Sequence, residues 1–142
     1  MFSFISRYFS TNIAIDLGTS NTLIFVKGRG LALDEPSVIV IQRESKLSDR
    51  VSLVATGHEA KAMIGRVPGE MQAIRPMKDG VIADFSAAEL MLKNFIKLVF
   101  QGSFFRLSLK LVICIPCGST QVERRAIREV ALGAGASQVF LL

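Results

Sequence analysis

The residues best suited to chemistry lie near the N-terminus, in a short polar break between two apolar runs. The break combines one carboxylate and one glycine with four small hydroxyl or amide residues: Asp16, Gly18, Thr19, Ser20, Asn21 and Thr22. Gly18 can take backbone angles that other residues resist, so the amides after it can converge on one point. Converging amides form a concave nest that suits an anion such as phosphate. A carboxylate beside the nest suits a metal ion, held directly or through water, because hard cations prefer oxygen ligands.

Two strands must position this break. The flanking runs contain Ile13 and Ile15 before it and Ile24, Phe25 and Val26 after it, all of which favour strands. The break is therefore predicted to be the tip of a β-hairpin. Small residues also suit an ordinary hairpin turn. Spacing alone leaves both interpretations open, because short motifs often match by chance.

The rest of the chain alternates strand and helix signals. Strands are expected at 37–41, 51–55, 71–74, 109–115 and 137–142, a polar loop at 42–50, and helices at 57–65, 86–100 and 121–132. Capping boxes beginning at Ser86 and Thr120 start the two longer helices. Their buried stripes are expected to be Met91, Phe95, Leu98 and Val99, and Val122, Ala126, Val130 and Ala131. Gly28 and Gly30 do not form a dinucleotide motif, since the third glycine and the following helix are missing.

The first ten residues are rich in aromatic side chains. On a helix, Phe2, Ile5 and Phe9 lie on one side, opposite several serines and one arginine. Such a segment can lie in a membrane interface, and this interpretation is favoured. The alternatives are packing on the chain's own domain or a frayed end.

Composition limits the possible classes of protein. The chain has 142 residues, half of them hydrophobic, which fits one domain with a real core. The net charge of +5 is scattered, and one tyrosine and no tryptophan are available for base stacking, so nucleic-acid binding is not expected. Two cysteines without a disulfide framework indicate a reducing, cytoplasmic setting. Cys114 is expected inside a buried strand, where it would act as a small hydrophobe.

Taken together, the order of elements resembles the first domain of the actin–Hsp70–sugar kinase superfamily, and within it the MreB family of bacterial actin homologues. The resemblance covers about Asn12 to Leu142, nearly the whole chain. The blocks that carry it are 15–22, 35–37, 57–61, 74–85 and 120–129.

This resemblance implies an α/β fold, namely an actin-like (ribonuclease H-like) ATPase domain with a five-stranded mixed sheet, helices and a small inserted subdomain. Residues 1–10 would be the membrane-binding segment. Residues 11–41 and 78–142 would form subdomain IA, and 42–77 the inserted subdomain IB. The chain would be truncated before the second domain.

The same resemblance implies a cytoplasmic protein at the inner face of the cell membrane that determines cell shape. It would bind ATP and Mg²⁺, form antiparallel double filaments with copies of itself, and direct the cell-wall elongation machinery. Gly18, Thr19, Ser20 and Asn21 would contact the phosphates, and Asp16 would lie near the magnesium. The family is a weak ATPase, but its catalytic glutamate segment and second phosphate loop are missing from these residues. The alternative is a remnant that keeps membrane or subunit contacts and does not hydrolyse ATP.

Overall fold

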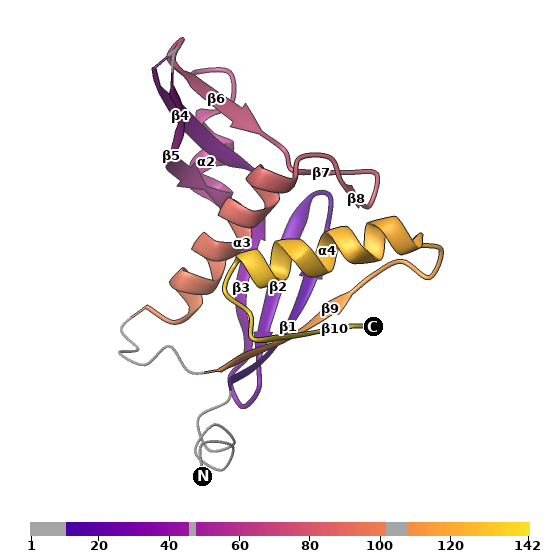
Figure 1. Ribbon diagram of the computed structural model, residues 1–142. Helices are drawn as coiled ribbons and strands as arrows, with labels where there is room; N and C mark the ends of the chain where they lie inside the picture. The colour runs from indigo at the N-terminus through magenta and orange to yellow at the C-terminus, as the bar shows by residue number, and fades with distance from the viewer. Residues whose placement is uncertain (1–10, 46–47, 102–107) are drawn as a thin grey trace.

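The computed structural model describes residues 11–45, 48–101 and 108–142 (Figure 1). Its larger sheet has five strands in the order β10-β9-β1-β2-β3. These strands are β1 (Thr11–Leu17), β2 (Asn21–Val26), β3 (Gly30–Pro36), β9 (Leu109–Cys114) and β10 (Gln138–Leu141). β1, β2 and β3 form an antiparallel meander, whereas β9 lies parallel to both β1 and β10. The predicted five-stranded mixed sheet is therefore confirmed.

Two helices, α3 (Phe85–Val99) and α4 (Gln121–Gly133), cover one face of this sheet (Figure 1). The sheet contributes every second residue to the core, because strand side chains alternate between faces. Ile13 and Ile15 of β1 are 2% and 0% exposed, and they lie in register with Leu111 and Ile113 of β9. Tyr8 and its neighbours, which precede β1, lie outside the described residues.

The start of α3 differs from the prediction. Its N-cap is Asp84, whose carboxylate accepts the Ala87 N–H, so the expected box at Ser86 is wrong. Asp84 can serve as the N-cap two residues earlier, because a carboxylate at this position accepts an amide of the first turn as well as a serine hydroxyl does. The box that joins Thr120 and Glu123 at the start of α4 is confirmed.

Each helix buries a slightly different stripe from the one expected. Leu98 is 46% exposed, because the buried arc of α3 extends from Phe95 toward Leu92 instead. Val122 is 78% exposed, since the stripe of α4 is centred on Ile127, five residues along the helix. Both errors come from a stripe placed a fraction of a turn to one side.

A second sheet, of three strands, holds the residues that were expected as a strand at 37–41 and a loop at 42–50. Its order is β5-β4-β6, with β4 (Ile39–Ser45), β5 (Ser48–Thr56) and β6 (Met71–Ile74). The predicted strand at 37–41 therefore belongs to this sheet, and the described residues of the predicted loop at 42–50 belong to the paired strands β4 and β5. The true third meander strand, β3, is an edge strand. Its charged Asp34 and Glu35 concealed it in the sequence, although charges are common on edges.

Short elements complete this upper part of the molecule (Figure 1). Helix α2 (Gly57–Met63) lies against the small sheet, and a two-stranded hairpin of β7 (Met77–Lys78) and β8 (Val81–Ile82) leads back to α3. The strand expected at 71–74 is confirmed as β6. The division into residues 1–10, 11–41 with 78–142, and 42–77 stays a prediction.

Cys114 is exposed, not buried, because it ends β9 on the face opposite Ile113; Cys114 and Cys117 are both free thiols. Among the helices that the structure describes, none is long and apolar enough to cross a bilayer.

Candidate functional site

The polar break is the tip of the β1–β2 hairpin, as predicted, and it lies beside the β7–β8 hairpin (Figure 1). Three residues, 18–20, join the two strands. The turn is closed by a hydrogen bond in which the Gly18 N–H donates to the Asn21 carbonyl at 3.1 Å. Thr19 and Ser20 are exposed at the tip.

Gly18 is needed here for space. A Cβ atom at this position would collide with the carbonyl oxygen of Asn21. Its φ angle is not among the positive ones, so the expected reason, unusual backbone angles, is wrong. A glycine lets the two ends of the turn approach closely enough to close it.

Two carbonyls of the turn point into the protein. The Ser37 hydroxyl donates to the Gly18 carbonyl at 2.7 Å, and the Ser37 N–H donates to the Ser20 carbonyl at 2.8 Å. In a planar trans peptide, the N–H of the next residue points the opposite way from the carbonyl. The amides of Thr19 and Asn21 are therefore directed away from Ser37.

The amides at the tip are available to a ligand. Among the described residues, neither the Thr19 N–H nor the Ser20 N–H has a hydrogen-bond acceptor. Consecutive unpaired amides at an exposed turn make an anion-binding concavity. The backbone of the turn is thus suited to contact phosphate oxygens.

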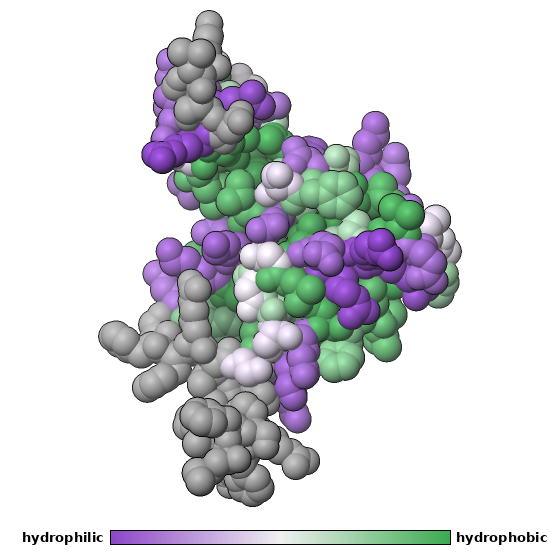
Figure 2. Space-filling model, in the orientation of Figure 1, coloured by the Kyte–Doolittle hydropathy of each residue, from purple (hydrophilic) through white to green (hydrophobic). Residues whose placement is uncertain are grey.

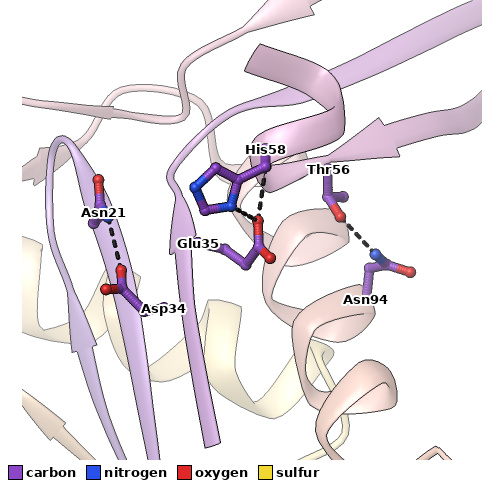
Figure 3. A network of polar contacts seen from close by, with 6 residues as sticks. All are labelled: Asn21, Asp34, Glu35, Thr56, His58 and Asn94. Carbon is purple, nitrogen blue, oxygen red and sulfur yellow. Dashed lines mark hydrogen bonds and ion pairs between the residues drawn. The ribbon is translucent and has the colours of Figure 1, made fainter. Parts of the chain in front are cut away.

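Most of the side chains of the break serve to hold the turn. The Thr19 hydroxyl accepts the Gly80 N–H at 2.9 Å, which ties the tip to the β7–β8 turn. The Asn21 amide donates to the Asp34 carboxylate at 2.7 Å, across to β3 (Figure 3). The Ser20 hydroxyl makes no hydrogen bond to any described residue. Most of these side chains are therefore engaged within the protein, and the backbone amides are the donors that remain available at the tip.

Asp16 lies two residues before Gly18, on the exposed face of β1. Its backbone neighbours in the sheet are Leu23 and Cys114. Within the described chain, its carboxylate has no hydrogen bond or ion pair, so its oxygens are free to hold a cation or a water. The described residues contain no group of three or more metal-ligating side chains. A magnesium ion here would take most of its ligands from water and phosphate, as is usual for that ion.

The crossing from the large sheet to the small one is fastened next to the site (Figure 3). The Glu35 carboxylate accepts the His58 N–H at 2.7 Å and lies 2.9 Å from the imidazole Nδ1. The Asn94 amide of α3 donates to the Thr56 hydroxyl at 2.7 Å. His58 is an exposed residue at the start of α2.

A separate cleft lies between the small sheet and the first turns of α3. Its volume is about 720 Å³, and its walls include Ile41, Gln72 and Leu90. In Figure 2 the part of the molecule that contains the small sheet forms a lobe above the rest of the protein. No residue of the turn lines this cleft, so the phosphate-binding candidate is a surface turn and not this hollow.

Sequence reasoning placed Thr22 in the polar break but missed its buried position behind the turn and its partner Ser37. Ser37 and Thr22 are both 0% exposed, and their hydroxyl oxygens lie 2.9 Å apart. Ser37 opens an otherwise apolar run, and a hydroxyl in that position was the available signal. Phe2, Ile5 and Phe9, the proposed membrane residues, lie outside the described residues.

Comparisons with known proteins agree with the family resemblance seen in the sequence. The family described as MreB/Mbl protein matches residues 10–142. The cell shape-determining protein MreB of Escherichia coli K12 is 58% identical over 134 residues, which cover 94% of this chain and 38% of that protein. The Haemophilus influenzae MreB is 54% identical over 142 residues, covering 100% of this chain and 40% of that protein. The chain therefore spans about two fifths of the length of these relatives.

Solved structures agree on the fold. MreB5 of Spiroplasma citri bound to ADP aligns with a TM-score of 0.77 and 32% identity, covering 94% of this chain and 38% of that one. A MamK double helical filament aligns with a TM-score of 0.71 and 20% identity, covering 93% and 40%, which supports the fold alone. The fold is actin-like, as predicted. None of these comparisons supports the alternative of a remnant that keeps only its contacts.

Proposed function

This chain belongs to the MreB/Mbl family, and on that premise we propose that it supplies the first phosphate-binding turn of an ATP site in a filament-forming, cell shape-determining protein. Its relatives carry the name of cell shape-determining proteins, and they are actin-like. The role of the turn in this chain is the part that we infer.

The observation that carries the proposal is the pair of unpaired amides at Thr19 and Ser20, directly after Gly18. Unpaired amides at an exposed tight turn suit the oxygens of a nucleotide phosphate. The related MreB5 structures of Spiroplasma citri were solved with ADP and with AMPPNP, which supports a nucleotide as the anion.

The metal in this proposal is Mg²⁺, and Asp16 is the residue that would hold it, through a water or directly. Bound Mg²⁺ would neutralise phosphate charge beside the turn. The residues of this chain have three tasks in the proposal. The turn binds the phosphates, Asp16 orients the ion, and the strands β1 and β2 hold both at fixed spacing.

Membrane attachment belongs to the same proposal. Phe2, Ile5 and Phe9 would insert at the inner face of the cell membrane, with the folded part on the cytoplasmic side. Copies of the protein would assemble into antiparallel double filaments there and act on the cell-wall elongation machinery. The aromatic spacing of this segment supports this part of the proposal.

Binding of phosphorylated and unphosphorylated adenosine tests the nucleotide proposal. MgATP and MgADP should bind the chain, and adenosine should bind at least about tenfold more weakly, because an anion nest contributes only through phosphate. Isothermal titration with each ligand measures the three affinities. Equal affinity for adenosine, or no binding of MgATP, would contradict the proposal.

Vesicle sedimentation tests the anchor. A chain with both Phe2→Glu and Phe9→Glu should stay in the supernatant, since two carboxylates oppose burial of that face in an anionic bilayer. A chain with Phe25→Glu and Phe140→Glu, which changes two exposed phenylalanines of the large sheet, is the matched control and should still pellet. Pelleting of the Phe2/Phe9 variant at the wild-type level would rule out the anchor.

A further inference from the structure

A buried pair of hydroxyls lies directly beneath the phosphate-binding turn. Ser37 belongs to the crossing between β3 and β4, and Thr22 is the second residue of β2. Both side chains are 0% exposed, and all the buried polar side-chain atoms of the described residues have hydrogen-bond partners. Burying a hydroxyl is unfavourable unless it is hydrogen-bonded, so the placement of these two needs an explanation.

The directions of their protons follow from the acceptors. A hydroxyl has one proton, and Ser37 donates its proton to the Gly18 carbonyl, which can only accept. The contact between the two hydroxyls, 2.9 Å long, must therefore be a donation from Thr22 to Ser37. The result is a short chain of hydrogen bonds that runs from Thr22 through Ser37 to Gly18.

Ser37 holds the turn at two points. Its hydroxyl binds the Gly18 carbonyl and its own N–H binds the Ser20 carbonyl, at 2.7 and 2.8 Å. No described peptide bond is cis. Each inward carbonyl therefore turns the following N–H outward, and the first of these is the unpaired amide of Thr19. If the Gly18–Thr19 peptide unit were free to rotate, its carbonyl oxygen could face the same point and repel an anion.

We propose that Ser37, supported by Thr22, is a positioning residue that keeps the Gly18–Thr19 peptide unit turned so that the Thr19 amide faces a bound phosphate. The inference rests on the proposed phosphate-binding function. It adds that the orientation of the turn depends on a residue of the crossing between the two sheets. Ser37 touches no ligand and acts only through the backbone of Gly18 and Ser20.

The test compares four variants with the wild-type chain. Ser37→Ala removes the hydroxyl that binds Gly18. Thr22→Val keeps the shape of the side chain but removes its donor, and Thr22→Ser keeps the donor. Thr56→Val is the matched control, because it removes another hydroxyl with low exposure (9%), one that accepts from Asn94 away from the turn. Each variant is titrated with MgATP and with inorganic pyrophosphate, and its thermal midpoint is recorded.

Ser37→Ala should weaken binding of both ligands about tenfold, which corresponds to the loss of one well-formed hydrogen bond. Thr22→Val should weaken binding about threefold, since it removes only the support behind Ser37. Thr22→Ser and Thr56→Val should bind as the wild type does, even where Thr56→Val lowers the thermal midpoint as much as Ser37→Ala. A simple loss of stability would move the midpoint without this pattern of affinities.

The possible failures can be told apart. If the wild-type chain binds and both Ser37→Ala and Thr22→Val bind equally well, the positioning role is overturned while the proposed function stands. If the wild-type chain binds pyrophosphate but not MgATP, the positioning role is still decided by the pyrophosphate series. If the wild-type chain binds neither ligand, both the proposed function and this inference are overturned. Should Ser37→Ala fail to fold, Thr22→Val against Thr22→Ser decides the question.

Discussion

The meander of the large sheet has two tight tips that both contain glycine, and only one of them has the properties of a binding site. The β1–β2 tip contains Gly18, whose missing side chain makes room for the Asn21 carbonyl. The β2–β3 tip contains Gly28 and Gly30, which have φ angles of 86° and 76° and open space around them. Glycine thus serves different purposes in the two tips. It avoids a steric clash in the β1–β2 tip, and it allows a positive φ angle in the β2–β3 tip.

The two tips also differ in what holds them. The β1–β2 tip receives hydrogen bonds from Ser37 and Gly80, which come from the two connections to the small sheet. The β2–β3 tip is held by Arg29, whose side chain donates to the Val99 carbonyl at 3.1 Å. A glycine turn becomes suited to anions when its carbonyls are bound from behind, because its amides are then left facing outward. Glycine content alone does not give this property.

The largest effect is expected when one glycine in each tip is replaced by alanine. Gly18→Ala should destabilise the chain by about 1–3 kcal/mol through overpacking and abolish MgATP binding. Gly28→Ala should cost about 1–2 kcal/mol through backbone strain at a positive φ and leave the affinity unchanged. Urea unfolding and isothermal titration measure the two quantities.

Gly118→Ala is the control for both, because its Cβ would meet open space at an ordinary backbone angle. It should change neither stability nor affinity beyond error. Loss of MgATP binding in Gly28→Ala, with binding kept in Gly18→Ala, would reverse the contrast between the tips.

A smaller effect is expected from replacing Asp16, a carboxylate that has no counterpart at the β2–β3 tip. Asp16→Asn should lower the affinity for MgATP about tenfold and leave the affinity for ATP in EDTA unchanged, because only the metal-dependent part is lost. Glu129→Gln, an exposed carboxylate on α4, is the matched control and should have no effect. Titrations with and without Mg²⁺ decide this, and an equal loss in EDTA would remove Asp16 from the metal site.

The smallest effects should come from the side-chain tethers. Thr19→Val removes the acceptor of the Gly80 N–H, and Arg29→Ala removes the donor to Val99. Each should cost about 0.5–1.5 kcal/mol of unfolding free energy, the usual net value of one hydrogen bond. Thermal unfolding followed by circular dichroism measures both. The affinity for MgATP should fall slightly in Thr19→Val and stay constant in Arg29→Ala, and a larger loss in Arg29→Ala would show that the second tip matters to binding.

Sequence patterns predicted the fold well where one element buries a clear stripe. The two longer helices, the parallel strands at 109 and 137 and the hairpin around Gly18 were all expected from their residue patterns, although the cap of α3 was misplaced. β3 was missed because an edge strand tolerates charges that a sequence pattern assigns to a loop. The far ends of β4 and β5 were missed for a similar reason, since their residues are polar and were assigned to a loop.

The candidate site was predicted only in its exposed half. Gly18, Thr19 and Ser20 stood out as small residues between two strands, and Asp16 as the carboxylate beside them. Ser37 lies 17 residues beyond Ser20, and its contact with the turn arises from the path of the chain between two sheets. The hydroxyl at the start of an apolar run was a local signal of a buried polar residue, but its partners at Gly18 and Ser20 were visible only in three dimensions.

The most direct measurement is a two-dimensional amide NMR titration of the wild-type chain with MgATP. The backbone amide signals of Thr19 and Ser20 should shift progressively as phosphate binds, whereas those of Gly28 and Arg29 at the opposite tip should stay in place. Shifts confined to the opposite tip, or no shift of Thr19 and Ser20 at saturating MgATP, would contradict the phosphate-binding role of the first turn.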